Sequence, residues 1–268
     1  MTRMKLTIIG GGNMGGAIVR GLVQGTIFQA SDITVIDVSD APLKALRDFN
    51  PAIRVASSDY NSVATADIVI LAVKPWLVQR VVETIRPHLN YANQIIVSIA
   101  AGITIDNLNA WLLQENKELS LPCLFRLIPN TAIAVRQSIT LISTRNATSK
   151  QRDCLVNIFD ELGSTVIVDE SKLAAGTALT SCGIAYLFRY VRAAMLAGVE
   201  MGLYPKEAQN MVVKTMLGAA SLLDDTQQNP EIEIDKVTTP GGITIQGLNT
   251  LEANGFSDAI IKAMKASR

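Results

Sequence analysis

The glycine-rich segment Gly10-Gly11-Gly12-Asn13-Met14-Gly15 constrains the fold of this chain more than any other feature. The apolar run Leu6–Ile9 precedes it, and the apolar positions of a helix follow it. A strand, a tight glycine turn and a helix in this order predict a dinucleotide-binding βαβ unit, rather than a merely flexible turn. Gly10 then permits the turn, Gly12 lets the backbone approach a pyrophosphate, and Gly15 allows close packing of helix on strand.

Asp37 ends the second expected strand, about twenty residues past the last glycine of the loop. A carboxylate there accepts hydrogen bonds from the adenosine ribose hydroxyls and repels a 2′-phosphate. The next residues are Val38, Ser39 and Asp40, so no arginine follows directly. The segment therefore favours NADH over NADPH. A second interpretation stays open, because an Asp after a strand can also cap the next helix.

Up to about residue 168 the chain alternates apolar runs with helix-length amphipathic segments. Most runs are continuously apolar, as in strands buried on both faces. The expected strands are Lys5–Gly10, Ile33–Asp37, Ile53–Val55, Ile68–Val73, Gln94–Ile99, Cys123–Ile128, Ser138–Ser143 and Thr165–Val168. The expected helices are Asn13–Gln24, Ala41–Asn50, Pro75–Leu89, Thr104–Leu113 and one that begins near Thr148. This order predicts an α/β fold with a mostly parallel, doubly wound Rossmann sheet covered by helices on both faces.

After Asp169 the strand signals stop and helical patterns continue to the end. Ala174–Met201 forms one long pattern, Pro205–Leu223 a second, and residues 242–268 a helix, a Gly-Phe turn and another helix. We therefore expect two domains, a dinucleotide-binding domain over 1–168 and an all-α domain over 169–268. Such an apolar helical domain predicts dimerisation, with an ordinary buried helical core as the alternative.

Composition excludes several other classes of protein. Lys plus Arg and Asp plus Glu number 24 each, without long runs of like charge, so we expect no nucleic-acid surface. Arg189, Arg192 and Glu200 interrupt the most apolar region, so we expect no membrane span. The three cysteines have no ligand spacing, which predicts reduced thiols in a cytoplasmic protein and no metal site.

Several further motifs occur in a distinctive order. They are Ala72-Val73-Lys74-Pro75, Val97-Ser98-Ile99-Ala100-Ala101-Gly102, Ile128-Pro129-Asn130-Thr131, Thr239-Pro240-Gly241-Gly242-Ile243-Thr244-Ile245 and Leu251-Glu252-Ala253-Asn254-Gly255-Phe256. With these motifs the chain resembles the pyrroline-5-carboxylate reductases from residue 5 to about 264. The Pro-Gly-Gly-x-Thr-Ile segment is the most specific piece, because general Rossmann dehydrogenases lack it. The resemblance implies reduction of L-1-pyrroline-5-carboxylate to L-proline by NAD(P)H, the last step of proline biosynthesis.

The resemblance also implies an assembly and a set of cofactor contacts. The family's helical domain dimerises by interlocking, often in rings of dimers, and the active site lies between the nucleotide domain of one subunit and the helical domain of its partner. Besides the glycine loop with Asn13 and Met14, the implied cofactor contacts are Ala72, Val73, Lys74, Pro75, Ile99, Ala100, Ala101 and Asn130. The Lys74 side chain can instead be an ordinary surface lysine, and Asn130 can simply fix a turn.

On the substrate side, the resemblance makes Thr244 the hydroxyl that hydrogen-bonds the ring nitrogen. Its expected place in the first turn of a helix agrees with this role. The backbone N–H groups of Gly241, Gly242 and Ile243 are expected to be free at that helix start for the substrate carboxylate. Thr239 and Glu170 complete the implied set, although Thr239 can also be a helix cap and Glu170 an exposed helix-start residue. The single histidine, His88, is expected to be solvated at a helix end.

The chain departs from the family pattern at several positions on this side. Thr180-Ser181-Cys182-Gly183-Ile184-Ala185-Tyr186 replaces the usual Ser-Gly-Ser-x-Pro-Ala-Tyr, and Gln227 stands where some members carry an acid. A related cyclic imino acid is therefore the alternative substrate. A β-hydroxyacid reductase would need a lysine in the helix Ala174–Met201, which has none. A nucleotide-binding sensor without turnover would leave the Pro-Gly-Gly-Ile-Thr segment without a purpose.

Overall fold

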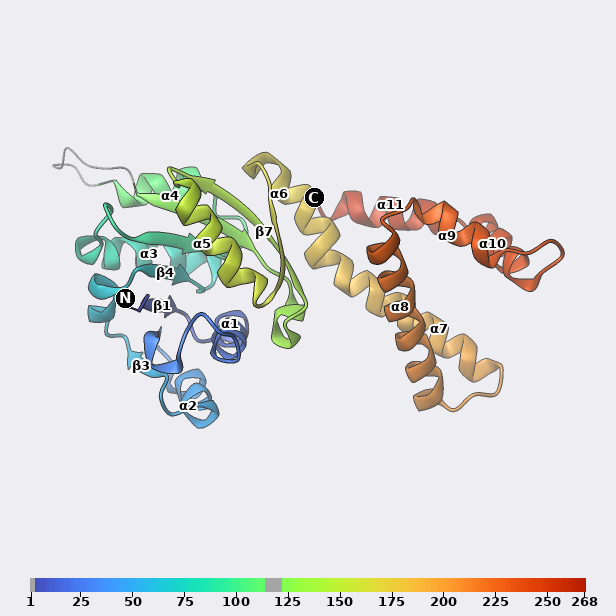
Figure 1. The fold of residues 1–268 in the computed structure, drawn as a ribbon, viewed down its shortest axis with the longest axis horizontal. Helices are drawn as coiled ribbons and strands as arrows, with labels where there is room; N and C mark the ends of the chain where they lie inside the picture. The colour runs from blue at the N-terminus through green and yellow to red at the C-terminus, as the bar shows by residue number, and fades with distance from the viewer. Residues whose placement is uncertain (1–2, 114–121) are drawn as a thin grey trace. The chain divides into compact units, whose positions relative to one another are not determined.

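The fold is centred on an eight-stranded sheet, seen in a computed structural model that describes residues 3–113 and 122–268 (Figure 1). The strand order is β3-β2-β1-β4-β5-β6-β7-β8. The strands are β1 Leu6–Ile9, β2 Ile33–Asp37, β3 Arg54–Ser57, β4 Ile68–Leu71, β5 Ile95–Ser98, β6 Cys123–Ile128, β7 Ser138–Arg145 and β8 Gly163–Ile167. Strands β1 to β6 are parallel, β7 runs antiparallel to β6, and β8 is parallel to β7. The predicted mostly parallel sheet is confirmed.

Helices cover both faces of this sheet, as expected for a doubly wound fold. On one face, α1 (Asn13–Val23), α2 (Asp40–Phe49) and α5 (Ser149–Asp160) share one buried cluster with strand residues such as Ile8. On the other face, α3 (Pro75–Ile85) and α4 (Ile105–Leu112) pack against the alternate strand residues, Ile9 among them. Neighbouring residues of β1 thus point to opposite faces, and both faces are apolar because both are covered.

Short 3₁₀ turns connect several of these elements: η1 Ala30–Asp32, η2 Asn61–Thr65, η3 Arg86–His88, η4 Thr131–Val135 and η5 Glu170–Lys172. The turn η3 shortens one predicted helix, because α3 ends at Ile85 rather than at Leu89. Pro87 explains the difference, since it lacks the N–H that would continue the helical ladder.

The C-terminal part is helical throughout. Its elements are α6 Leu173–Thr177, the π-helical turn η6 Ala178–Cys182, α7 Gly183–Glu200, α8 Pro205–Thr226, α9 Pro230–Val237, α10 Ile243–Ala253 and α11 Phe256–Ala266. The expected single helix Ala174–Met201 is therefore interrupted by a wider π turn. Helix α9 was not predicted, although Pro230 occupies its first turn and Asn229 caps it by accepting from the Glu231 N–H at 3.0 Å.

The chain divides into two compact units, residues 1–181 and 182–268. This division falls later than the domain boundary that we predict at 168/169. The intervening segment packs on the first unit, because Leu173 is buried against Ile128 and Leu141. Gly176 lies so close to Leu141 that a Cβ would sit 2.3 Å from its side chain.

The second unit buries almost none of its apolar surface within itself. Across residues 182–268, all of which the structure describes, Ala208 is the only buried apolar side chain larger than glycine. Large apolar side chains are exposed on every helix of the unit, for example Phe188, Leu217, Val237, Ile243 and Ile261. The alternative of an ordinary buried helical core is therefore not realised in the isolated chain.

Candidate active site

The glycine loop after β1 is closed by backbone contacts on two sides. Gly10 has a φ of +107°, and a Cβ on it would lie 2.5 Å from the carbonyl oxygen of Ala72. A Cβ on Gly15 would lie 1.9 Å from the carbonyl oxygen of Gly10. These two glycines therefore let β1, the end of β4 and the start of α1 approach one another, as the motif predicts.

Gly12 differs from these two glycines because it faces open space. It is exposed, and a Cβ on it would have no neighbour within 4 Å. It is also the N-cap of α1 and no side chain caps the helix there. The first N–H groups of a helix have no carbonyl partners within it and carry partial positive charge. This arrangement leaves room and donors for a phosphate group beside Gly12 and Asn13.

The carboxylate of Asp37 is held by two backbone amides. Its Oδ2 accepts from the N–H of Gly11 at 2.7 Å, and its Oδ1 accepts from the N–H of Ser39 at 2.9 Å. Asp37 does not cap α2, whose N-cap is Ser39. Each carboxylate oxygen has about two acceptor positions, so both can still accept from ribose hydroxyls.

The segments after β4 and β5 lie next to the glycine loop because the strand order is β1-β4-β5. Ala72 and Val73 are half-buried, and Lys74, the N-cap of α3, is exposed, with Pro75 behind it at the first helical position. Ile99 is half-buried and Ala101 is exposed, whereas the Ala100 side chain is buried among the residues under α3 and α4. Ala100 therefore offers only its backbone to a bound cofactor.

Asn130, which follows β6, is used within the protein. It is 5% exposed, and its Oδ1 accepts from the Ala132 N–H at 3.0 Å at the start of η4. Its Nδ2 donates to the carbonyl oxygen of Thr180 in the π turn at 3.0 Å. These bonds favour the turn-fixing alternative over a bond to the nicotinamide carboxamide.

Glu170 also has protein partners. Its Oε1 accepts from the Ile105 N–H at 2.7 Å and from Arg126 Nη1 at 3.0 Å. The residue is half-buried, so it is not the exposed helix-start Glu of the alternative interpretation. Arg126 was not among the predicted site residues, although a single charged residue in the apolar run Cys123–Ile128 suggests a charged partner nearby.

Thr239, Gly241, Gly242, Ile243 and Thr244 lie together at the start of α10, in the second unit. One expectation is wrong here: the N–H of Gly242 is not free, because it donates to the carbonyl oxygen of Thr239 at 2.9 Å. This bond closes a turn in which Gly241 has a φ of +73°. Thr244 is exposed in the first helical turn, next to Ile243, which is 86% exposed. The first-turn N–H groups of Ile243 and Thr244 have no partners within the helix.

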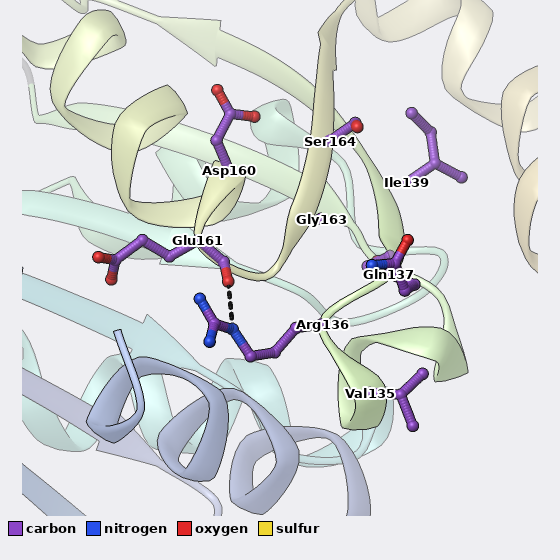
Figure 2. A pocket seen from close by; sticks show the side chains of 9 residues that line it. Val135, Arg136, Gln137, Ile139, Asp160, Glu161, Gly163 and Ser164 are labelled. Atoms are coloured by element: carbon purple, nitrogen blue, oxygen red, sulfur yellow. Dashed lines mark hydrogen bonds between the residues drawn. The ribbon is translucent and has the colours of Figure 1, made fainter. Parts of the chain in front are cut away.

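A pocket lies elsewhere in the first unit (Figure 2). Its volume is about 700 Å³, and its lining comes from η4, the end of α5 and the starts of β7 and β8. Arg136 in this pocket donates through Nε to the backbone carbonyl of Glu161 at 2.8 Å. None of the predicted site residues lines it, so the pocket does not mark the predicted site. His88 is exposed in η3, as expected.

Two family models match separate parts of the chain. Residues 170–268 match the model for pyrroline-5-carboxylate reductase dimerisation, and residues 5–102 match the model for NADP oxidoreductase, coenzyme F420-dependent. Pyrroline-5-carboxylate reductase 2 of Dictyostelium discoideum is 33% identical over 276 residues, covering 98% of this chain and 90% of that protein. Pyrroline-5-carboxylate reductase 1 of the same organism is 34% identical, but the chain spans only 48% of its length.

A solved structure shows the same architecture with a cofactor in place. The Plasmodium falciparum pyrroline carboxylate reductase with NADP bound superposes with a TM-score of 0.85 and 26% identity, covering 100% of this chain and 96% of the other. The similarity in sequence and fold thus extends over both units. The chain belongs to the pyrroline-5-carboxylate reductase family, NAD(P)H-dependent oxidoreductases that reduce L-1-pyrroline-5-carboxylate to L-proline.

Proposed function

We propose how the residues of this chain divide the family reaction between them. In the reaction a hydride passes from nicotinamide C4 of NAD(P)H to the imine carbon, and the ring nitrogen gains a proton. The first unit holds the dinucleotide, with its pyrophosphate at the N-terminus of α1. The observation that supports this most directly is the open space at Gly12, since Gly10 and Gly15 of the same loop are closed by backbone.

NADH is the preferred donor in this proposal. Asp37 presents a carboxylate that two backbone amides fix beside the glycine loop. A fixed negative charge favours ribose hydroxyls over a 2′-phosphate. Two further segments border the rest of the cofactor, including the nicotinamide. They are Ala72–Pro75 and Ile99–Ala101, which follow the carboxyl ends of the neighbouring strands β4 and β5.

Thr244 is the proposed catalytic residue, because its hydroxyl hydrogen-bonds the ring nitrogen as electrons arrive there. The N–H groups of Ile243 and Thr244 at the start of α10, together with that of Gly241, bind the substrate carboxylate. Gly242 contributes the turn rather than a donor, since its N–H is already bonded to Thr239. Positioning of this kind supplies much of the rate in a hydride transfer.

A second copy of the chain covers the apolar helices of the second unit. The matched family model names dimerisation for residues 170–268, and Ala208 alone is buried among the apolar side chains of 182–268.

The run Glu170–Glu200 is also long and apolar enough, by length and composition, to cross a membrane. We infer that a second copy of the chain, and not a membrane, covers this apolar run, because Arg189 and Arg192 lie within it and charged side chains are costly inside a bilayer. We place the dimer in the cytoplasm, where Cys123, Cys154 and Cys182 remain free thiols.

A related cyclic imino acid is a second candidate substrate. The observation behind it is the π turn Ala178–Cys182, which falls where the chain departs from the family's Ser-Gly-Ser-x-Pro segment. π turns occur frequently at functional sites. The six-membered imine carboxylate would use the same carboxylate and nitrogen contacts as the five-membered one.

Steady-state oxidation of NADH and NADPH with L-1-pyrroline-5-carboxylate and with the six-membered analogue tests these assignments. We expect turnover with the five-membered imine, and Thr244→Ala should lower kcat by about 10²-fold while Thr244→Ser restores most of it. Thr250→Ala is the matched control, because the Thr250 hydroxyl on the same helix bonds the Gln246 carbonyl at 2.8 Å. Absence of oxidation with both cofactors would contradict the reductase assignment, and full activity of Thr244→Ala would remove that hydroxyl from the mechanism.

A further inference from the structure

Glu170 and Arg126 form an ion pair that connects three elements of the first unit. Glu170 begins η5, Arg126 lies within β6, and Glu170 Oε1 is 3.0 Å from Arg126 Nη1. The same oxygen accepts a 2.7 Å hydrogen bond from the N–H of Ile105, the first residue of α4. The Arg126 side chain is only 13% exposed and the Glu170 side chain 24%, so solvent screens their interaction weakly.

The pair leaves Arg126 dependent on Glu170. Within residues 3–113 and 122–268, no second acceptor bonds the Arg126 guanidinium, and its Nε is buried without a partner. A buried charge that loses its single partner is strongly destabilising. Because the same Glu170 oxygen also accepts from the Ile105 N–H, the pair can hold a neighbouring segment in place.

That neighbouring segment is the loop of residues 99–104, between β5 and α4. At its first end, the Ile99 N–H donates to the Leu71 carbonyl at 3.1 Å. At its second end, Thr104 caps α4 by accepting from the Asn107 N–H at 3.0 Å, and Glu170 accepts a hydrogen bond from the N–H of Ile105. A carboxylate at a helix N-terminus is favourable because of the helix dipole. Glu170 thus completes the second attachment point of the loop.

We propose that Glu170 is a positioning residue for the nicotinamide end of the cofactor. It holds the loop 99–104 through Ile105, while Arg126 fixes the direction of its carboxylate. This inference rests on the proposed function, which places Ile99–Ala101 beside the nicotinamide. Glu170 then acts through the loop and touches neither cofactor nor substrate. Asp37, which the proposed function places at the other end of the dinucleotide, is the last residue of β2, and β1 and β4 separate this strand from β5.

Binding of two ligands to the free enzyme, without substrate, tests this role. NADH reaches the loop 99–104, whereas ADP-ribose lacks the nicotinamide and does not. We expect Glu170→Ala to weaken NADH binding about tenfold and to leave ADP-ribose binding unchanged. Glu170→Gln should recover most of the NADH affinity, because its amide oxygen can still accept from the Ile105 N–H. Asp106→Asn is the matched control: it removes the ion pair with Arg145 from the first turn of the same helix and should change neither affinity.

Equal losses for both ligands, or no loss for either, would overturn the proposal. If Glu170→Ala does not fold, the double variant Arg126→Met with Glu170→Leu replaces the buried pair by apolar side chains and still leaves Ile105 without its acceptor. A normal ratio of NADH to ADP-ribose affinity in that variant would also overturn it. Normal NADH binding with impaired imine reduction in Glu170→Ala would indicate a direct substrate contact instead. Failure of the proposed function is distinguishable, because it appears as absent turnover in the unmodified enzyme.

Discussion

The backbone N–H of Gly11 donates a 2.7 Å hydrogen bond to the carboxylate of Asp37. One acid therefore supports the glycine loop and, in the proposed complex, also accepts from the ribose. Its second oxygen is bonded to the Ser39 N–H at 2.9 Å, which fixes the plane of the carboxylate. In the proposed complex, cofactor choice and loop geometry are thus coupled through a single side chain.

Asp37→Asn should shift cofactor choice towards NADPH. The amide keeps an acceptor for Gly11 but removes the negative charge that repels a 2′-phosphate. We expect the ratio of kcat/KM for NADPH to that for NADH to rise at least about tenfold. Asp40→Asn is the control, because Asp40 is an exposed neighbouring acid paired with Arg47 and should leave the ratio unchanged. An unaltered ratio in Asp37→Asn would contradict a selective role for this carboxylate.

Alanine at two glycines of the loop should affect different properties, the stability of the fold at Gly10 and the affinity for NADH at Gly12. Gly10→Ala forces a Cβ to within 2.5 Å of the Ala72 carbonyl oxygen at a φ of +107°. We expect it to lower the free energy of unfolding by at least about 2 kcal/mol. Gly12→Ala meets no neighbour within 4 Å, so the thermal midpoint should stay unchanged while NADH affinity falls.

Calorimetry together with NADH titration measures both quantities for the two variants. The contrast itself is the test, since each variant is the control for the other. Unimpaired NADH binding by Gly12→Ala would mean that the pyrophosphate does not approach the loop at that residue.

Local sequence patterns predicted most of the sheet, but not the partners of its polar side chains. Mostly apolar runs located β1, β2, β4, β5 and β6, because strands covered on both faces are largely apolar. The strand β3, Arg54–Ser57, has no buried residue and was predicted only as the short run Ile53–Val55. The roles of Asn130 and Glu170 were beyond such patterns, since their partners Thr180 and Ile105 lie 50 and 65 residues away in the chain. The bond of Gly242 to Thr239 is local, however, and a Pro-Gly-Gly sequence already favours a turn.

Charging the exposed apolar surface of the second unit should dissociate the protein. Leu217 in α8 is 57% exposed, and an aspartate there would be costly to bury against another copy. We expect Leu217→Asp to lower the sedimentation mass from twice 28.8 kDa towards 28.8 kDa at micromolar concentration. The thermal midpoint of the unmodified protein should also rise with its concentration.

Leu113→Asp is the matched control for dissociation, because Leu113 is 55% exposed in the first unit. It should leave the sedimentation mass unchanged. A mass of 28.8 kDa for the unmodified protein under the same conditions would refute the proposed dimer.

Cys123 should make the fold less stable in alkaline solution. Burial raises the pKa of its thiol from the ordinary value of 9.0 to about 11. The unfolded thiol therefore releases its proton in a range where the folded thiol still holds it, so the free energy of unfolding falls between pH 9 and pH 11. Cys123→Ala should reduce this decline by up to about 1.4 kcal/mol per pH unit.

Denaturant titrations across this pH range, with Cys182→Ala as the control variant, give the two slopes. The control should decline with pH as steeply as the unmodified protein does. An identical slope in Cys123→Ala would show that other groups cause the alkaline loss of stability.

The position of β1 in the sheet has a consequence for the order of folding events. It is synthesised before the other strands of this sheet, yet it lies between β2 and β4, with Leu6 paired to Ile33 on one side and Ile68 on the other. Until β4 is synthesised, β1 presents an open edge, and Gly10 lacks the Ala72 carbonyl against which it closes. Because long loops close slowly, the nucleotide-binding turn matures only after this distant pairing. A refolding chain should therefore capture dinucleotide no earlier than the pairing of β1 with β4.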